Sequence, residues 1–330
     1  MNVTARALLA PVVSLLLLLA GPPGLAEDSP TPEAQLTDSI SVNYVLVPFV
    51  PLDRHGRPLR GLRPRDVRLL VDGAPVMTDL FESSAQAPVS FTILLDGSGS
   101  MGLAGKMEGA RAALRTLFSR QRPGDEYSLF LCAAGEVTEL VPFTPSGQRV
   151  LRAFDAVEPF GKTTLFDAVA RMPDKSILGS NGSRAIILLT DGLDNASETD
   201  RPTLLALLES IDVPVYPLGL VSREQLLPAA GPAAQEARLD LGVLADLARM
   251  SGGRLAIASR PEELKDGIET VLSELRAQYL VGFAPSGKGK VRYRRIALDI
   301  SGPVSAVRVR SGYRGTDPPL IARKGTFRSR

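Results

Sequence analysis

Between residues 89 and 276, short apolar segments alternate with longer segments whose apolar residues recur every three or four positions. The short segments have the composition of strands that are buried on both faces, and the longer ones have the period of amphipathic helices. The expected strands are 91–96, 126–134, 138–143, 184–191, 213–220 and 254–258. This alternation predicts a doubly wound α/β fold, with helices on both faces of a mostly parallel sheet. The strand at 138–143 follows its predecessor after a short turn, so we expect it to be an antiparallel edge strand.

The expected helices are 105–121, 202–210, 241–250 and 261–278. In the first of them, Met107, Ala110, Leu114 and Leu117 share one face. The stretch 222–240 is rich in alanine and proline, and we expect it to be a surface loop.

The two flanks of this region have a different pattern. Residues 40–87 contain alternating apolar residues and the turn sequence Asp72-Gly73, which together predict three or four short strands. So few strands are unstable alone. Three further strands are expected at 277–283, 291–300 and 304–313, within a C-terminal segment at 277–314. The two flanking segments are therefore predicted to form one small all-β module beside an α/β domain at 88–276.

The N-terminus has the pattern of a secretory signal peptide, residues 1–26, with cleavage near Ala26. Its apolar run, residues 7–20, is shorter than the roughly 20 residues that span a membrane. The alternative is an uncleaved anchor. Residues 27–39 are rich in proline and acidic residues, which indicates a flexible leader. We therefore expect a secreted or periplasmic protein with no stable membrane anchor after cleavage.

Composition excludes several classes of site. The chain has one histidine, His55, and one cysteine, Cys132. A zinc site with several histidines and an internal disulfide are therefore excluded, and Cys132 is expected to be a buried core residue. Residues 276–330 hold 13 lysines and arginines against two aspartates, and 315–330 is expected to be a disordered basic tail. The basic residues do not interleave with aromatic ones in the pattern of single-strand nucleic-acid binders, so nucleic acid is not an expected partner.

A group of oxygen-bearing side chains follows the ends of two expected strands. The first strand ends at Asp96 and is followed by Ser98 and Ser100, which alternate with glycines, and Asp191 ends the strand 184–191. Thr163 lies in a loop before a helical segment. Ligands of open α/β sheets bind at this edge. Oxygen ligands without nitrogen or sulfur predict a hard divalent cation, Mg²⁺ or another such as Mn²⁺ or Ca²⁺.

Two glycine motifs nearby resemble phosphate-binding motifs, but we do not expect either of them to bind phosphate. The sequence GSGSMG, residues 97–102, matches the dinucleotide-binding pattern, but Asp96 would face the pyrophosphate with like charge. The sequence GKTT, residues 161–164, resembles the end of a P-loop, but the motif's first glycine is absent because Ala156 occupies its position.

The five oxygen-bearing residues, in this order and at these positions, resemble the metal-ion-dependent adhesion site of von Willebrand factor type A domains. The resemblance covers about residues 88–275, and the flanks resemble secreted bacterial proteins that carry a type A-related domain. It implies that Asp96, Ser98 and Ser100 contact the metal directly, and that Thr163 and Asp191 do so directly or through water. An acidic side chain of a partner protein would take the metal's open position. Where relatives commonly have a second glycine, this chain has Lys162, which could weaken metal binding or help to hold the incoming carboxylate.

Three classes of function remain open from the sequence. The first is a non-enzymatic module that grips an acidic residue of a partner protein through a divalent cation. The second is a structural envelope protein with a type A scaffold and no functional metal site. The third is a metal-assisted hydrolase, in which Asp167 or Asp194 would be the general base. The oligomeric state is not indicated.

Overall fold

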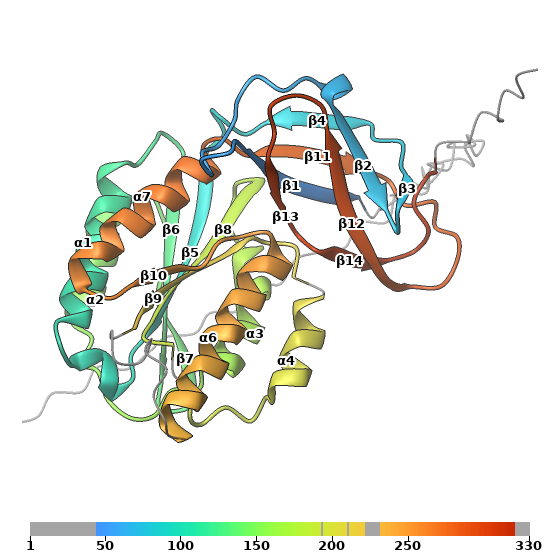
Figure 1. Cartoon of the computed structure of the whole chain (residues 1–330). Helices are drawn as coiled ribbons and strands as arrows, with labels where there is room; N and C mark the ends of the chain where they lie inside the picture. The colour runs from blue at the N-terminus through green and yellow to red at the C-terminus, as the bar shows by residue number, and fades with distance from the viewer. Residues whose placement is uncertain (1–43, 193, 210, 222–231, 321–330) are drawn as a thin grey trace, which may run out of the picture. The chain divides into compact units, whose positions relative to one another are not determined.

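The computed structural model describes residues 44–192, 194–209, 211–221 and 232–320, with the backbone alone for 232–239. The predicted signal peptide, the predicted leader and residues 321–330 of the predicted tail lie outside these residues. The strands of the α/β domain are β5 (Val89–Asp96), β6 (Glu126–Ala133), β7 (Glu136–Thr144), β8 (Ser183–Thr190), β9 (Val215–Leu220) and β10 (Ala256–Ala258). They form one sheet in the order β10-β9-β8-β5-β6-β7 (Figure 1).

The sheet has the predicted doubly wound topology. β5 pairs in parallel with β6 and β8, and β9 pairs in parallel with β8 and β10. β7 is antiparallel to β6 and forms one edge, as predicted. All eight residues of β5 are buried, which explains why its sequence is a continuous apolar run rather than an alternating one.

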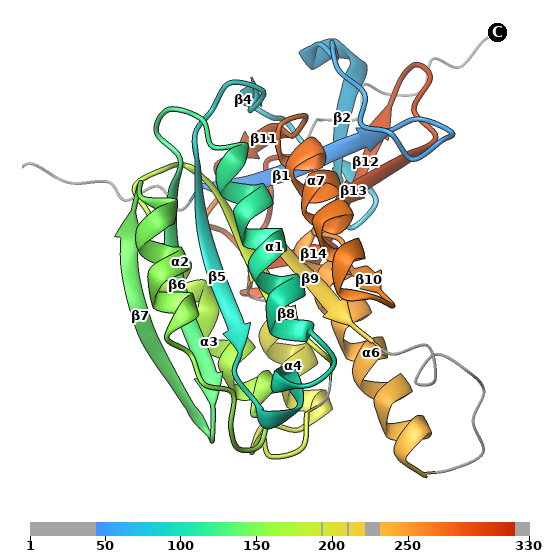
Figure 2. The ribbon, with the colours of Figure 1, turned by 90° about the vertical axis from the view of Figure 1, so that its left-hand side faces the viewer.

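Helices cover both faces of this sheet. The α-helices are α1 (Lys106–Ser119), α2 (Gly147–Asp155), α3 (Leu165–Ser176), α4 (Arg201–Leu208), α6 (Pro232–Ser251) and α7 (Leu264–Leu275), and the short 3-10 helices are η1 (Pro64–Asp66), η2 (Gly99–Gly102) and η3 (Pro261–Glu263). Figure 2 shows α1, α2 and α7 on one face, with α3, α4 and α6 behind the sheet. Consecutive residues of β5 serve the two faces, since Ile93 packs in the core under α1 and Leu94 in the core under α3.

One predicted loop is partly wrong. Of the stretch expected to be a surface loop, residues 222–231 lie outside the described residues, but α6 already begins at Pro232 and runs through the rest of it. Proline is tolerated in the first turn of a helix, and the alanines and charged residues that follow have high helix propensity. The helix predicted at 241–250 is thus the C-terminal half of a longer one.

The flanks form a separate pair of sheets, as predicted. Their strands are β1 (Val45–Leu52), β2 (Val67–Val71), β3 (Ala74–Pro75), β4 (Leu80–Ser83), β11 (Tyr279–Phe283), β12 (Arg292–Ile300), β13 (Ala306–Val309) and β14 (Gly312–Gly315). The two sheets have the orders β13-β1-β11-β4 and β14-β12-β2-β3. Strands of the N-terminal flank pair directly with strands of the C-terminal flank, β1 with β11 and β2 with β12. Neither flank could therefore form this module alone.

The strand predicted at 304–313 is wrong in one respect, because it is two strands. β13 pairs with β1 in one sheet, and β14 pairs with β12 in the other. The chain changes sheets between Val309 and Gly312. A Cβ atom on Gly312 would lie 2.3 Å from the carbonyl oxygen of Arg294, so only glycine permits this close approach of two backbones.

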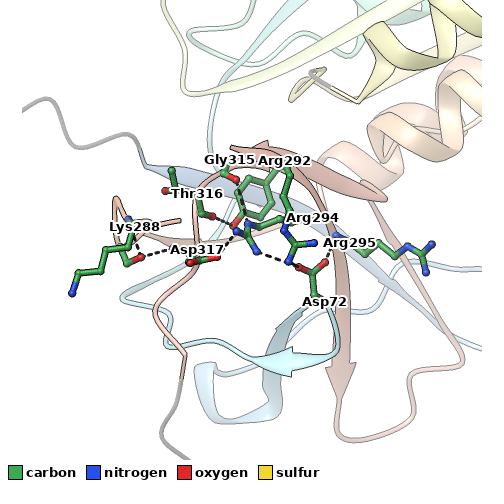
Figure 3. Close-up of polar contacts among 10 residues, drawn as sticks. Asp72, Lys288, Arg292, Arg294, Arg295, Gly315, Thr316 and Asp317 are labelled. Atoms are coloured by element: carbon green, nitrogen blue, oxygen red, sulfur yellow. Dashed lines mark hydrogen bonds and ion pairs between the residues drawn. The ribbon is translucent and has the colours of Figure 1, made fainter. Parts of the chain in front are cut away.

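A network of charged groups joins the turn after β2 to the segment that follows β14 (Figure 3). Arg294 of β12 is only 3% exposed. Its guanidinium lies 3.3 Å from the carboxylate of Asp72 and also pairs with Asp317. Arg292 lies 3.0 Å from Asp72. The buried guanidinium is thus compensated by two carboxylates, one from each side, which is the condition for a buried charge to be tolerated.

A second buried ion pair lies where both flanks leave the α/β domain. Arg276, directly after α7, is 5% exposed and pairs with Asp125, which is 1% exposed. Asp125 also accepts the backbone N–H of Val89 at 2.9 Å, and Arg276 donates to the carbonyl of Ala87 at 3.3 Å. This pair therefore connects the start of β5 with the end of α7.

Candidate functional site

Two of the predicted site residues emerge at the same edge of the sheet. β5 and β8 are adjacent and parallel, with Leu95 opposite Leu189. Asp96 ends β5, and Asp191 directly follows β8. Their exposed fractions are 0% and 1%. Two buried carboxylates at one place are costly unless hydrogen bonds or cations compensate them.

Hydrogen bonds hold both carboxylate oxygens of Asp96. Oδ1 accepts the backbone N–H of Ser98 at 2.9 Å, and Oδ2 accepts the hydroxyl of Thr190 at 2.7 Å. Burial raises the pKa of Asp96 to about 6, with a contribution from the charge of Asp191, while the hydrogen bonds from Ser98 and Thr190 act in the opposite direction. The carboxylate is therefore fixed in position but poorly solvated, and a nearby cation would stabilise its charged form.

The turn after β5 directs two hydroxyls to the same place. Oγ of Ser98 and Oγ of Ser100 lie 3.0 Å apart. Ser98 is buried and Ser100 is half-buried. A Cβ atom on Gly97 would lie 2.4 Å from Cδ1 of Leu131, so a side chain at this position would require Leu131 to shift.

Thr163 lies in a loop whose backbone is held from two sides. The carbonyl of Gly161 accepts the N–H of Gly99 at 3.1 Å, which ties the loop to the turn after β5. The N–H of Thr163 donates to Oδ1 of Asn195 at 3.0 Å, and its carbonyl accepts the N–H of Asn195 at 3.2 Å and that of Ala196 at 3.1 Å. Thr163 is 1% exposed, yet its Oγ1 has no hydrogen-bond partner among the described residues. Its backbone is satisfied and its buried hydroxyl is not.

Asp191 also carries an unsatisfied oxygen. Its Oδ1 is buried and finds no hydrogen-bond partner within the described part of the chain. Its Oδ2 lies 2.7 Å from Nζ of Lys106, the first residue of α1. The side chains of Lys106 and Asp191 are 17% and 0% exposed. The ammonium of Lys106 therefore contacts one of the two carboxylates of the site.

The sequence indicates Lys162 as the ammonium beside this site, but the structure puts Lys106 in contact with it. Lys162 is exposed, and its carbonyl accepts the N–H of Ala134 at 3.3 Å. Asn195 and Thr190 were also missed. Thr190 directly precedes Asp191 and Asn195 follows it four residues later, which is a weak sign of proximity. Nothing in the spacing of Lys106 connects it with Asp191, which lies 85 positions later.

The donor set suits a hard divalent cation, because it consists of carboxylate and hydroxyl oxygens. Over residues 44–320, apart from the gaps in the description, no three His, Cys, Asp or Glu side chains are grouped as a metal site. A cation would therefore depend on the hydroxyls of Ser98, Ser100 and Thr163 as well as on the two aspartates. The buried oxygens without partners, Oγ1 of Thr163 and Oδ1 of Asp191, fit such a cation, since each would gain a partner on binding.

Asp167 and Asp194, the two carboxylates considered as general bases, accept hydrogen bonds from neighbouring loops. Asp167 accepts the N–H groups of Glu198 at 2.9 Å and Thr199 at 3.0 Å. Burial raises the pKa of Asp167, but these hydrogen bonds outweigh it and keep the pKa below its usual value. Asp194 accepts the hydroxyl of Ser197 at 2.9 Å, and burial raises its pKa despite that bond. Both groups therefore hold the loops around Thr163 in place through these hydrogen bonds.

No helix in the described ranges is long and apolar enough to cross a membrane.

A family model described as the von Willebrand factor type A domain matches residues 91–193. A search of curated proteins found no match.

Similar solved structures include a von Willebrand factor type A protein from Catenulispora acidiphila (TM-score 0.46, 12% identity), which covers 82% of this chain and 72% of that one. Another is proximal thread matrix protein 1 from the mussel byssus with a zinc-occupied MIDAS motif (TM-score 0.46, 16% identity), covering 61% of this chain and 48% of that one. A third is the vWF domain of the type V pili tip protein Mfa5 from Porphyromonas gingivalis (TM-score 0.42, 12% identity), covering 56% of this chain and 94% of that one.

The predicted family and the predicted fold class are thus confirmed by the family model and by the parallel sheet with its helices on both faces. The chain contains a von Willebrand factor type A domain, to which the family model assigns residues 91–193.

Proposed function

We propose that this protein is a secreted or periplasmic, non-enzymatic binding module that holds a divalent cation and uses it to grip an acidic side chain of a partner protein. The observation that carries the proposal is the pair of buried oxygens without hydrogen-bond partners among the described residues, Oγ1 of Thr163 and Oδ1 of Asp191. Of the thirteen buried side-chain polar atoms without a hydrogen-bond partner among the described residues, these two belong to predicted cation ligands, and a bound divalent cation would give each of them a partner.

Asp96, Ser98, Ser100, Thr163 and Asp191 would hold the cation, which we expect to be Mg²⁺, Mn²⁺ or Ca²⁺. When bound, it supplies a positive charge to which a carboxylate from outside can attach. The hydroxyls of the site are neutral, so they complete the coordination without cancelling the charge that the partner's carboxylate recognises. Asn195 fixes the backbone of Thr163, and Thr190 fixes the carboxylate of Asp96.

One alternative gains support from a specific contact. The ammonium of Lys106 already compensates Asp191 at 2.7 Å, as it would in a type A scaffold that works without a metal. The two functions differ in their response to chelation. A scaffold would bind its partners equally well with and without a divalent cation.

The test is capture of partner proteins by the purified, tagged chain in Mg²⁺ and in EDTA. Asp96→Asn keeps the size of the side chain but removes the charge, and we expect it to abolish capture in Mg²⁺, as EDTA does for the wild type. Glu198→Gln is the matched control, because Glu198 is an exposed carboxylate in the loop that follows β8 and is not among the proposed ligands. Capture that survives both EDTA and Asp96→Asn contradicts the metal-dependent function.

The secreted or periplasmic location rests on the sequence of residues 1–26. Fractionation of cells that express the full chain tests it, with the shortened mature protein expected outside the cytoplasm.

A further inference from the structure

Lys106 occupies a position that helix stability does not explain. It is the first residue of α1. The N-terminus of a helix carries partial positive charge, so an ammonium there is disfavoured, and acidic residues are preferred. Its contact with Asp191, at 2.7 Å, offsets this cost. The position of Lys106 is therefore accounted for by the site and not by the helix.

The backbone before Lys106 is shaped to bring it there. Ala104 has a φ of 54° and Gly105 a φ of 71°, two consecutive residues in the left-handed region. For alanine this conformation costs about 1 kcal/mol or more. The turn is closed by the N–H of Lys106, which donates to the carbonyl of Leu103 at 3.2 Å. A strained turn thus sets the start of α1 and with it the reach of the Lys106 side chain.

Lys106 also compensates a charge that would otherwise be unpaired. Asp96 and Asp191 are both buried. Among the described residues, the cation that contacts this pair is Lys106, through Asp191. A divalent cation held by the same oxygens would meet the ammonium as a like charge at close range. The side chain of Lys106 is partly exposed and has four flexible methylenes, so it can turn toward solvent.

We propose that the ammonium of Lys106 is a tethered counter-cation of this site, so that a divalent cation binds by exchange: it takes its place beside Asp191 as Lys106 leaves. The inference rests on the proposed function, because it requires that the site binds a divalent cation. It adds that the protein itself raises the metal concentration at which the site fills, because Lys106 competes with the metal for Asp191. No covalent step is involved.

The test compares the wild type with Lys106→Met in titrations with Mn²⁺ followed by calorimetry. Lys106→Met keeps much of the side-chain volume and removes the charge. We expect it to bind Mn²⁺ at least tenfold more tightly than the wild type, which corresponds to about 1.4 kcal/mol. Lys162→Met is the matched control, since it removes an equal charge from the loop that carries Thr163 without breaking the contact with Asp191, and its affinity should stay within about threefold of the wild type.

A second measurement on the same variants is thermal unfolding. In EDTA, Lys106→Met should unfold at a lower temperature than the wild type, because Asp191 has lost its counter-cation. In saturating Mn²⁺ the difference should shrink or disappear, because the metal has displaced Lys106 in the wild type. A difference that is the same in both conditions indicates a merely structural ion pair and overturns the exchange.

The outcomes separate the two proposals. If the wild type and Lys106→Met bind Mn²⁺ with equal affinity, the exchange is wrong and the metal-binding function stands. If neither protein binds Mn²⁺, both fall. Should Lys106→Met fail to fold, Lys106→Gln tests the same loss of charge, and Lys106→Arg, which keeps a cation, should bind Mn²⁺ as weakly as the wild type.

Discussion

The substitution Thr163→Val should separate the stability of this protein from its function. The Thr163 hydroxyl is buried and lacks a hydrogen-bond partner within the described ranges, while Asn195 and Ala196 hold the backbone on either side. Leaving a buried hydroxyl unsatisfied costs about 1–3 kcal/mol. Valine has the same shape and no polar atom. We therefore expect Thr163→Val to raise the free energy of unfolding in EDTA by about 1 kcal/mol, or about 2 °C in the midpoint of thermal unfolding.

The same substitution should weaken metal binding. It removes one of the oxygens that would hold the cation, and we expect the affinity for Mn²⁺, measured by calorimetry, to fall at least tenfold. If Thr163→Val raises the stability of the protein and weakens metal binding, the Thr163 hydroxyl is retained for function and not for stability.

Thr190→Val is the matched control. Thr190 is equally buried, but its hydroxyl donates to Asp96 at 2.7 Å and accepts the N–H of Gly192 at 3.0 Å. Its loss should lower the free energy of unfolding in EDTA by about 1.5–3 kcal/mol. The reasoning is refuted if Thr163→Val destabilises the protein as much as Thr190→Val does, or if it leaves the affinity for Mn²⁺ unchanged.

Two further substitutions test the buried charges. The pKa of Asp96 is raised from the usual 3.8 to about 6. The stabilising contribution of this group to the free energy of unfolding is therefore present below pH 3.8 and is lost as the pH rises from 3.8 through about 6. In urea titrations in EDTA, the free energy of unfolding of the wild type relative to Asp96→Asn should fall by about 3 kcal/mol across this window, and a difference independent of pH would contradict the shift. Arg276→Met leaves Asp125 buried without its cation and should cost about 3–5 kcal/mol in the same assay. Arg120→Met breaks an exposed pair with Glu269 and should cost less than about 1 kcal/mol, so equal losses would contradict the importance of burial.

The sheet and the edge at which the site lies could be predicted because burial on both faces leaves a mark in the sequence. β5 and β8 are continuous apolar runs that end in Asp96 and just before Asp191, and parallel strands end at the same edge. The flanking module could be predicted for a different reason, because neither flank has enough strands to be stable alone.

What could not be predicted depends on contacts between loops. The ammonium of Lys106 reaches Asp191 only because two left-handed residues turn the chain before α1, and alanine at one of them carries no sequence mark of that conformation. Asn195 appears in the sequence as one polar residue among several, and its role depends on a loop that folds back onto Thr163. Similarly, the break between β13 and β14 depends on the close approach of Gly312 to Arg294.

The most direct test of the central claim is anomalous diffraction at the manganese edge from crystals of the protein grown with Mn²⁺. The account predicts one strong peak among the side-chain oxygens of Asp96, Ser98 and Ser100, together with a Lys106 side chain that has left Asp191. The absence of a peak at this edge of the sheet, or a peak only elsewhere on the chain, would contradict it.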